Sequence, residues 1–474
     1  MHARVRSLGA VLVVLAVLAY LAAVALLYPQ ALAFDALSFV MSARAGVIDY
    51  GHALYLPLLR VAGTVAGHGA APERVAQLVS ALGGALGFAL LWRRIERGGA
   101  ARPLAALVAA CFALSTLLWQ EAGSVEPTTW TVAALLVAGE AADACARRAT
   151  SGRFSVLLAA FAVAVGFHLV SVCALPWLAW RARGAQRGLA PARLLALAGA
   201  ALAVLFLAFL GGELATYLRY WSGFVPDFRG GIARELGEHL RRGGRLLLEG
   251  APVLLALGIV SASLAWRARL REAREAAWLG APYLAAFLLF GRPLVALLVP
   301  VLLAGALLVG RIAAASRAAS AARAAGPPPG AAGVVLGLSA ALQLALTLPQ
   351  ALEWRQTPDA SRARAELLAL HVPAGARLFA GPLTNHLRYY WPALDVVSLP
   401  GLWHDAHARD RSVDPVALVR REVESAGKPC LLSSDGAAFL LGEPAADLTR
   451  LGISLERAIP IPGDPKLALF PLGE

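Results

Sequence analysis

The sequence LGAVLVVLAVLAYLAAVALLY, at residues 8–28, contains no charged side chain. A bilayer core about 30 Å thick is crossed by a helix of about 20 mostly apolar residues, so this run is long enough to cross. Similar apolar runs recur at 73–92, 103–119, 128–145, 154–167, 169–180, 192–210, 251–266, 277–290, 293–310 and 332–349. The pattern predicts an all-α polytopic membrane bundle of about 11 transmembrane helices.

The composition also indicates a membrane protein. Apolar residues make up 59% of the 474 residues, charged residues make up 15%, and the mean hydropathy is +0.65. Soluble domains are about 45–50% apolar and about 25% charged. These values exclude a soluble enzyme, a disordered chain and a fibrous protein.

The net charge of +13 comes from arginine, because Lys428 and Lys466 are the only lysines. A basic chain can bind nucleic acid, but most of these arginines flank apolar runs, where they set membrane topology. We therefore expect no nucleic-acid partner. The arginine clusters at 4–6, 93–102, 147–153, 181–193, 267–274 and 311–323 share one side if 154–180 forms a short hairpin. The positive-inside rule makes that side the cytoplasm, with the N-terminus inside and the C-terminus outside a bacterial inner membrane.

Two features near the membrane admit more than one interpretation. The first apolar run could be a signal peptide, because Ala31-Leu32-Ala33 resembles a cleavage site, although the run is longer than is usual there. Residues 231–248 show helical apolar spacing among many arginines. This pattern is typical of an amphipathic helix at the outer interface, either resting on headgroups or binding an anionic ligand.

After residue 349 the composition changes to that of a small α/β domain. Short apolar runs at 377–380, 395–399, 430–433 and 467–470 alternate with helical stretches at 360–371, 384–391 and 414–426. Asp414-Pro415 is a typical helix start. The predicted domains are therefore a transmembrane domain at 1–349 and an extracytoplasmic α/β domain at 350–474. Its histidines and aromatic residues between 386 and 407 could stack on sugar or pack against the loop predicted at 29–72.

Ionisable residues are sparse inside the predicted helices, where a transporter would usually keep charge. Glu140 and Asp143 are exceptions, and we expect an ion-paired helix end that includes Arg147. By contrast, Asp35, Glu126, His168 and Arg292 belong to four separate outer loops. Two carboxylates, an imidazole and a guanidinium at one membrane boundary indicate a site there.

Several short motifs resemble polytopic glycosyltransferases of the GT-C fold, which use polyprenyl-phosphate sugars, and in particular the protein O-mannosyltransferase-like group. The motifs are Phe34-Asp35-Ala36-Leu37 after the first helix, Gly51-His52-Ala53-Leu54-Tyr55 in the first outer loop, Trp119 to Trp130, Gly166-Phe167-His168, and Gly291-Arg292-Pro293. The resemblance covers most of residues 8–310. Asp35 lacks the second acidic neighbour of some members.

The resemblance implies an inverting transfer of a sugar from a polyprenyl-phosphate carrier to a lipid, glycan or protein acceptor on the outer face. Asp35 would be the general base. The substrate-binding candidates are Glu126, His52, Tyr55, His168, Arg292 and Trp119. Any metal ligands are unknown; no cofactor is certain, and a divalent metal is possible. Membrane lipids are further expected partners.

Each of these residues also has a structural interpretation. Asp35 could cap a helix that starts near Ala36, Arg292 could anchor a helix at the interface, and aromatic residues favour headgroup depth. Two other functions stay open as well. A lipid-linked sugar transporter or flippase would move the carrier without consuming the sugar bond, and a non-catalytic scaffold would need only the C-terminal domain.

Overall fold

The structure is a computed structural model that describes residues 2–32, 34–46, 50–67, 69–148, 150–182, 199, 232–267, 271–289, 295–322, 330–409, 413–441, 453 and 457–472. The chain divides into two compact units. The first, here the helical unit, comprises Met1–Pro29, Ser42–Gly211 and Pro226–Gln356. The second, here the C-terminal unit, comprises Gln30–Met41, Gly212–Val225 and Thr357–Glu474. The predicted crossing at 192–210 lies almost entirely outside the described residues.

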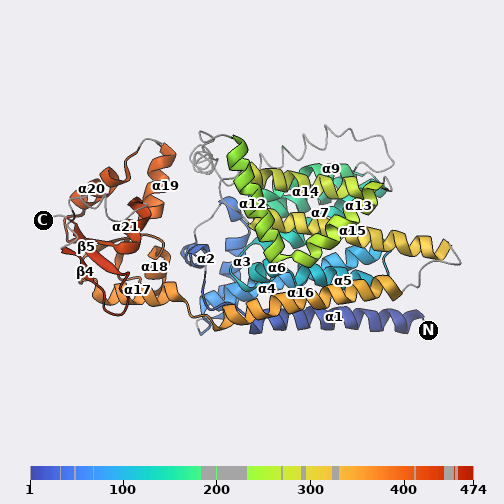
Figure 1. The fold of residues 1–474 in the computed structure, drawn as a ribbon, viewed down its shortest axis with the longest axis horizontal. Helices are drawn as coiled ribbons and strands as arrows, with labels where there is room; N and C mark the ends of the chain where they lie inside the picture. Colours follow the sequence, from blue (N-terminus) through green and yellow to red (C-terminus); the bar gives the residue numbers. More distant parts are fainter. Residues whose placement is uncertain are drawn as a thin grey trace. The chain divides into compact units, whose positions relative to one another are not determined.

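Long apolar helices dominate the helical unit (Figure 1). In chain order the elements are α1 (His2–Leu26), η1 (Tyr50–His52), α3 (Tyr55–Ala66), α4 (Pro72–Arg97), α5 (Arg102–Ala113), α6 (Thr116–Gly123), α7 (Thr128–Arg147), α8 (Ser151–Phe167), η2 (Leu169–Ala174), α9 (Leu175–Ala182), α12 (Ile232–Gly250), α13 (Pro252–Arg267), α14 (Arg271–Leu289), α15 (Val295–Ala322) and α16 (Gly330–Gln356). Helix α2 (Phe34–Ala45) runs across the boundary between the units.

In the described chain, three helical stretches are long and apolar enough to cross a membrane. They are Pro72–Arg97 (α4), Val295–Ser316 (within α15) and Ala331–His371, which covers α16 and α17. Two bent helix pairs bring the number to five if each pair is one span. The protein is therefore a helical membrane protein that crosses the bilayer more than once.

Helices α4 and α7 pack side by side in the same direction. Near their N-termini, the Thr129 hydroxyl donates to the Ser80 carbonyl at 2.8 Å. Near their C-termini, Arg94 pairs with Asp143 at 3.2 Å. Since two consecutive parallel crossings need a return between them, α5 and α6 must bring the chain back across the unit.

The return is a broken helix, whereas the sequence predicted one crossing at 103–119. Helices α5 and α6 meet at an angle of 67°. The break lies at Ser115, whose hydroxyl donates to the Phe112 carbonyl at 2.7 Å and accepts from the Leu118 N–H at 3.4 Å. A serine that caps a new helix in this way offers the backbone an alternative to continuing the old one.

Residues 154–180 form the hairpin that the arginine pattern requires. Helix α8 ends at Phe167, His168 adopts an extended backbone conformation, and η2 leads into α9. Arg147, just before α8, and Arg181, in the last turn of α9, line the same cavity. The chain therefore leaves this end of the unit along α8 and returns to it along α9.

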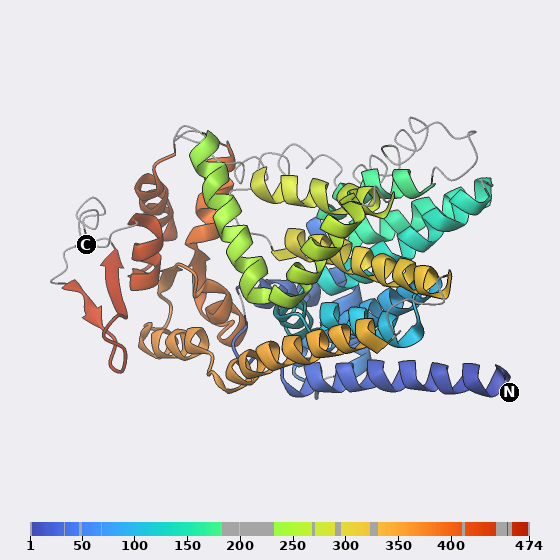
Figure 2. The same ribbon diagram turned by 45° about the vertical axis from the view of Figure 1, so that its right-hand side comes forward.

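The amphipathic stretch at 231–248 is helical as predicted and forms α12. It meets α13 at an angle of 109° (Figure 2). The face of α12 that packs inward contains His239, whose Nδ1 lies 2.9 Å from the Leu288 carbonyl, and Gly243, where a Cβ would clash with Phe287. Leu240 and Leu248 are exposed, so part of the predicted apolar face does not pack within the protein.

The stretch 29–72, predicted as a long outer loop, contains the helices α2, η1 and α3. Helix α3 buries Tyr55, Leu56 and Leu59 and exposes Val61 and Val65. One of these helices, α2, starts close to the helix start expected near Ala36.

The C-terminal unit contains a five-stranded mixed sheet with strand order β2-β1-β3-β5-β4. Strands β1 (Arg377–Ala380), β2 (Asp395–Ser398) and β3 (Cys430–Ser433) are parallel neighbours, while β5 (Ala468–Leu472) pairs antiparallel with β3 and with β4 (Ile459–Pro460). The helices are α17 (Ala360–His371), α18 (Thr384–Tyr390), α19 (Leu399–Arg409), α20 (Pro415–Ala426) and α21 (Ser434–Leu441). Four strands and three of these helices occupy the predicted runs.

Asp359 connects this unit's first helix to the segment Gln30–Met41. Its carboxylate caps α17 through the Arg362 N–H at 2.9 Å, interacts with the Leu32 backbone N–H, and lies 3.4 Å from His386 Nε2. His386 is 2% exposed. A buried carboxylate therefore holds the chain three residues before Asp35.

At the start of β2, Asp395 lies between Lys428 Nζ at 2.6 Å and Arg377 Nε at 2.8 Å. These two hydrogen bonds hold the pKa of the Asp395 carboxyl below its ordinary value. Its stabilising contribution is complete above an ordinary Asp pKa of about 3.9 and is lost as the pH falls through the lower folded pKa. Because the side chain is 37% exposed, solvent screening limits the contribution to about 1 kcal/mol at most.

We expect Asp395→Asn to lower the free energy of unfolding by about 0.5 kcal/mol near pH 7 and to have almost no effect near pH 3. Denaturant unfolding of the full-length protein, followed by fluorescence, measures both values. An equal loss at the two pH values would contradict the ionic origin of the stabilisation.

Candidate active site

Polar side chains from α3 and α4 meet the backbone of the α6–α7 turn within the helical unit. The Tyr55 hydroxyl lies 2.8 Å from Ser80 Oγ, and both side chains are buried. Ser80 Oγ accepts the Glu126 backbone N–H at 3.1 Å and lies 3.2 Å from the Glu126 carbonyl. The structure thus brings together two of the predicted residues, Tyr55 and Glu126, through a serine that the sequence analysis did not identify.

Neighbouring hydrogen bonds fix the start of α7 against α4. Besides the Thr129 bond to Ser80, the Trp130 indole N–H donates to the Val79 carbonyl at 2.8 Å. These bonds order the turn that carries Glu126, whose side chain is partly buried. Glu126 therefore lies on a rigid support, which a binding residue needs if its position is to be maintained.

The two predicted histidines are also in contact. The rings of His52 and His168 stack edge to face with centroids 4.7 Å apart. His168 Nδ1 accepts the Val170 N–H at 3.4 Å and so caps η2. The Leu54 N–H donates to the Gly166 carbonyl at 2.7 Å, which joins the segment between η1 and α3 to the end of α8.

Trp119 and Glu121 lie on the short helix α6. Trp119 is 3% exposed, and its ring packs edge-on against Tyr20 of α1 with centroids 5.8 Å apart. Glu121 is 8% exposed and interacts with Thr128, and its charge, like that of Glu126, acts on Tyr55. Burying a carboxylate in an apolar helix costs free energy, so such residues are rare and usually have a partner or a function. Sequence reasoning missed Glu121, although its position at the end of an apolar run was the available signal.

Asp35 lies in the first turn of α2, which begins at Phe34. The helix expected near Ala36 is therefore present, and the role of the Asp35 side chain, as a base or as a cap, stays a prediction. The structure describes the backbone of Asp35 but not its side chain, and Arg292 lies outside the described residues. Within the described part of the chain, no group of three or more His, Cys, Asp or Glu side chains could hold a metal ion.

Comparison with solved structures identifies the architecture. The chain superposes on ArnT from Cupriavidus metallidurans in its apo state, with a TM-score of 0.60 and 16% identity over 98% of each chain. It also superposes on the same protein bound to undecaprenyl phosphate, with a TM-score of 0.58 and 14% identity over 98% of this chain and 97% of the other. The chain has the GT-C fold. No protein-family model and no curated protein sequence matches it.

The GT-C assignment confirms the resemblance found in the sequence. The fold is that of a polytopic membrane protein, in agreement with the long apolar helices of the helical unit. Ser80 and Arg94 are separated by 14 residues of α4, a rise of about 21 Å. The Tyr55–Ser80–Glu126 cluster and the ion pairs around Arg94 are therefore separated by about 21 Å along α4.

Gly166 provides a direct test of how the segment with His52 and Leu54 fits against the α8–η2 break. A Cβ at this position would lie 2.7 Å from the Leu54 side chain. We expect Gly166→Ala to displace Leu54 and the adjacent His52 and to lower stability by about 1–3 kcal/mol, the usual cost of overpacking. Thermal unfolding of the purified protein measures the loss.

Gly152→Ala is the matched control, because Gly152 lies on the same helix and a Cβ added there would have no other atom within 4 Å. This change should be neutral or stabilising by up to about 1 kcal/mol, because alanine favours the helix. Equal effects of the two substitutions would show that the contact between Leu54 and Gly166 does not constrain the site.

Proposed function

We propose that the protein is a membrane glycosyltransferase that moves a sugar from a polyprenyl-phosphate carrier to an acceptor on the outer face of a bacterial inner membrane. The observation that carries the proposal is the match over nearly the whole chain to ArnT, including a structure of ArnT bound to undecaprenyl phosphate. The arrangement of polar groups at the Tyr55–Ser80–Glu126 end supports it.

The proposed membrane topology follows from the positions of the arginine clusters along the whole chain. We propose about 11 crossings, with the N-terminus in the cytoplasm and the region 350–474 outside as an extracytoplasmic domain. The gathering of Arg94, Arg147 and Arg181 around one cavity supports a common side for these arginines. The Tyr55–Ser80–Glu126 end then faces outward, where the head of a flipped lipid carrier would be presented.

The proposed reaction suits this location. A polyprenyl-phosphate sugar keeps its tail in the bilayer and its sugar at the interface, so the enzyme must bind it at that boundary. In an inverting transfer, a base removes the proton of the acceptor hydroxyl as its oxygen attacks the anomeric carbon. The bond from that carbon to the carrier phosphate breaks on the opposite side, and polyprenyl phosphate leaves.

Asp35 is the proposed base. Its place in the first turn of α2 favours an ionised carboxylate, because the N-terminus of a helix stabilises negative charge, and an ionised carboxylate is the form a base needs. Positive charge near the leaving phosphate lowers the barrier through preorganised electrostatics. We propose Arg292 for this role, because a guanidinium can hold phosphate through two parallel hydrogen bonds.

The remaining predicted residues, except Trp119, are proposed to bind substrate. Tyr55 and Glu126 share Ser80, and His52 contacts His168, so the four residues form two linked pairs that could hold sugar hydroxyls. Trp119 is buried against Tyr20, and we propose that it supports α6 beneath Glu121.

We expect Asp35→Asn to reduce transfer by about 10²–10⁴-fold, the usual contribution of a general base, while binding of undecaprenyl phosphate stays within about twofold of the wild type. Radiolabelled transfer measures the rate, and native mass spectrometry measures binding. A variant with full activity would refute the role of Asp35.

Glu73→Gln is the matched control, since Glu73 is also an acidic residue in the first turn of a helix. It removes the same charge from the same kind of helix position, where each such charge stabilises by about 0.3–1 kcal/mol. Transfer by this variant should stay near the wild-type rate, so a comparable loss would indicate a general effect of helix destabilisation.

A further inference from the structure

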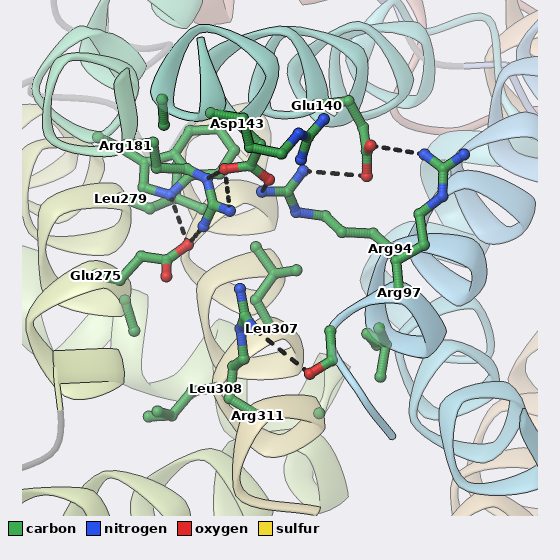
Figure 3. A pocket seen from close by; sticks show the side chains of 17 residues that line it. Arg94, Arg97, Glu140, Asp143, Arg181, Glu275, Leu279, Leu307, Leu308 and Arg311 are labelled. Carbon is green, nitrogen blue, oxygen red and sulfur yellow. Dashed lines mark hydrogen bonds and ion pairs between the residues drawn. The ribbon is translucent and has the colours of Figure 1, made fainter. Parts of the chain in front are cut away.

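At the end of the helical unit opposite Tyr55, a cavity of about 320 Å³ opens between α4, α7, α9, α14 and α15. Its size lies at the lower end of the range for ligand pockets, about 300–1,000 Å³. Figure 3 shows the charged side chains that line it. The proposed glycosyl transfer does not use this cavity, because α4 separates it from the Tyr55–Ser80–Glu126 cluster by about 21 Å.

Five arginines and three carboxylates from the described residues line the cavity. The carboxylates are Glu140, Asp143 and Glu275, and all three are engaged in ion pairs. Arg94 pairs with Glu140 at 3.5 Å and Asp143 at 3.2 Å, Arg97 pairs with Glu140 at 2.7 Å, and Arg181 pairs with both Asp143 and Glu275. The lining therefore carries an excess of two positive charges.

Two of the paired arginines, Arg94 and Arg181, are buried rather than solvated, whereas Arg97 is exposed. The side chains of Arg94 and Arg181 are 6% and 8% exposed, and each guanidinium carbon lies within 6 Å of the centroid of the buried Trp177 ring, at 5.6 and 5.8 Å. Trp177 itself donates toward Glu275 at 3.4 Å. Gly139 permits this packing, because a Cβ there would lie 2.5 Å from the Trp177 ring.

Arg311 and Arg147 supply the positive charge that no carboxylate balances. In the described chain neither pairs with a carboxylate, and Arg311 donates only to the Gly98 carbonyl, at 3.5 Å. The guanidinium groups of Arg94, Arg181 and Arg311 approach the same space from three different helices (Figure 3). Each guanidinium has five N–H donors, so donors remain beyond those used by the ion pairs.

Stability alone does not account for this arrangement. Burying an ion pair costs several kcal/mol in desolvation, and apolar side chains of similar volume often stabilise as well or better. The half-buried Arg311 also repels Arg94 and Arg181 in the free protein, whereas the charge of the exposed Arg147 is screened by solvent. A bound dianion would remove that repulsion and accept several charged hydrogen bonds at once.

We infer that this cavity is a binding site for a phosphate monoester, formed by Arg94, Arg181 and Arg311 with Arg147 at its margin. The two negative charges of a phosphate monoester match the excess charge of the lining, and guanidinium groups match the geometry of its oxygens. The same phosphate chemistry is offered by an anionic lipid headgroup of the inner leaflet and by a soluble phosphate. The inference does not depend on the proposed glycosyl transfer.

The test uses the full-length protein purified in detergent and freed of lipid, at pH 8. In one arm inorganic phosphate is titrated against sodium chloride of equal ionic strength, and in the other short-chain phosphatidic acid is titrated against phosphatidylcholine. A ligand that binds the folded state raises Tm in a saturable manner. Saturation with phosphatidic acid alone identifies a lipid headgroup, and saturation in the first arm identifies a soluble phosphate; both support a phosphate site.

Variants locate the site. Arg311→Gln and Arg147→Gln each remove one charge without breaking any ion pair described above, so both variants should fold. Each should weaken phosphate binding about tenfold, because it removes a charged hydrogen bond. Arg93→Gln is the control, because Arg93 is an exposed residue at the same end of α4 and does not line the cavity; it should bind as the wild type does. The inference is overturned if neither arm gives a saturable rise in Tm, or if both cavity variants titrate like the wild type.

Discussion

The parallel packing of α4 against α7 is the constraint on which the helical unit depends. Polar contacts fix the two helices at both ends, through Ser80 and Thr129 at one end and through Arg94 and Asp143 at the other. Between these contacts the interface is apolar and contains small residues, with Gly83 and Gly87 of α4 facing α7. Sliding or rotating one helix would break hydrogen bonds in a region where water cannot replace them.

This packing separates a cluster of hydroxyl groups at one end of the helix pair from a cluster of charged side chains at the other. The contact at the Ser80 end holds the turn that carries Glu126 and brings Tyr55 against it. The contact at the Arg94 end concentrates guanidinium groups around a cavity. The proposed transfer would use the Ser80 end, and the inferred phosphate site lies at the Arg94 end.

The sequence predicted those parts of the fold that local patterns determine. The helix after Asp414 begins as expected, with its carboxylate accepting the Val416 N–H at 3.1 Å. The break at Ser115 was not predictable from apolarity alone, because the segment is uniformly apolar and one serine decides whether the helix continues. The ion pairing of Glu140 and Asp143 was correctly expected, but their partners come from α4 and α9 rather than from Arg147. Partners on other helices are set by packing, which the sequence spacing does not reveal.

In the candidate site, too, the sequence predicted the residues that belong to local motifs but not those whose role depends on packing. Sequence motifs identified Tyr55, Glu126, His52 and His168, and the structure joins them into two pairs. Ser80 was missed because a small hydroxyl in the apolar helix α4 carries no motif, and Glu121 was passed over although it lies within the motif from Trp119 to Trp130. Their importance becomes visible only when burial and hydrogen bonding are known.

The most direct test of the central claim is to incubate the purified wild-type protein with a panel of polyprenyl-phosphate sugars and to measure the release of polyprenyl phosphate. The account predicts that at least one donor loses its sugar to an acceptor and that the new glycosidic bond has the inverted anomeric configuration. Consumption of none of the donors, or movement of an intact donor across vesicles in place of its consumption, would contradict the account.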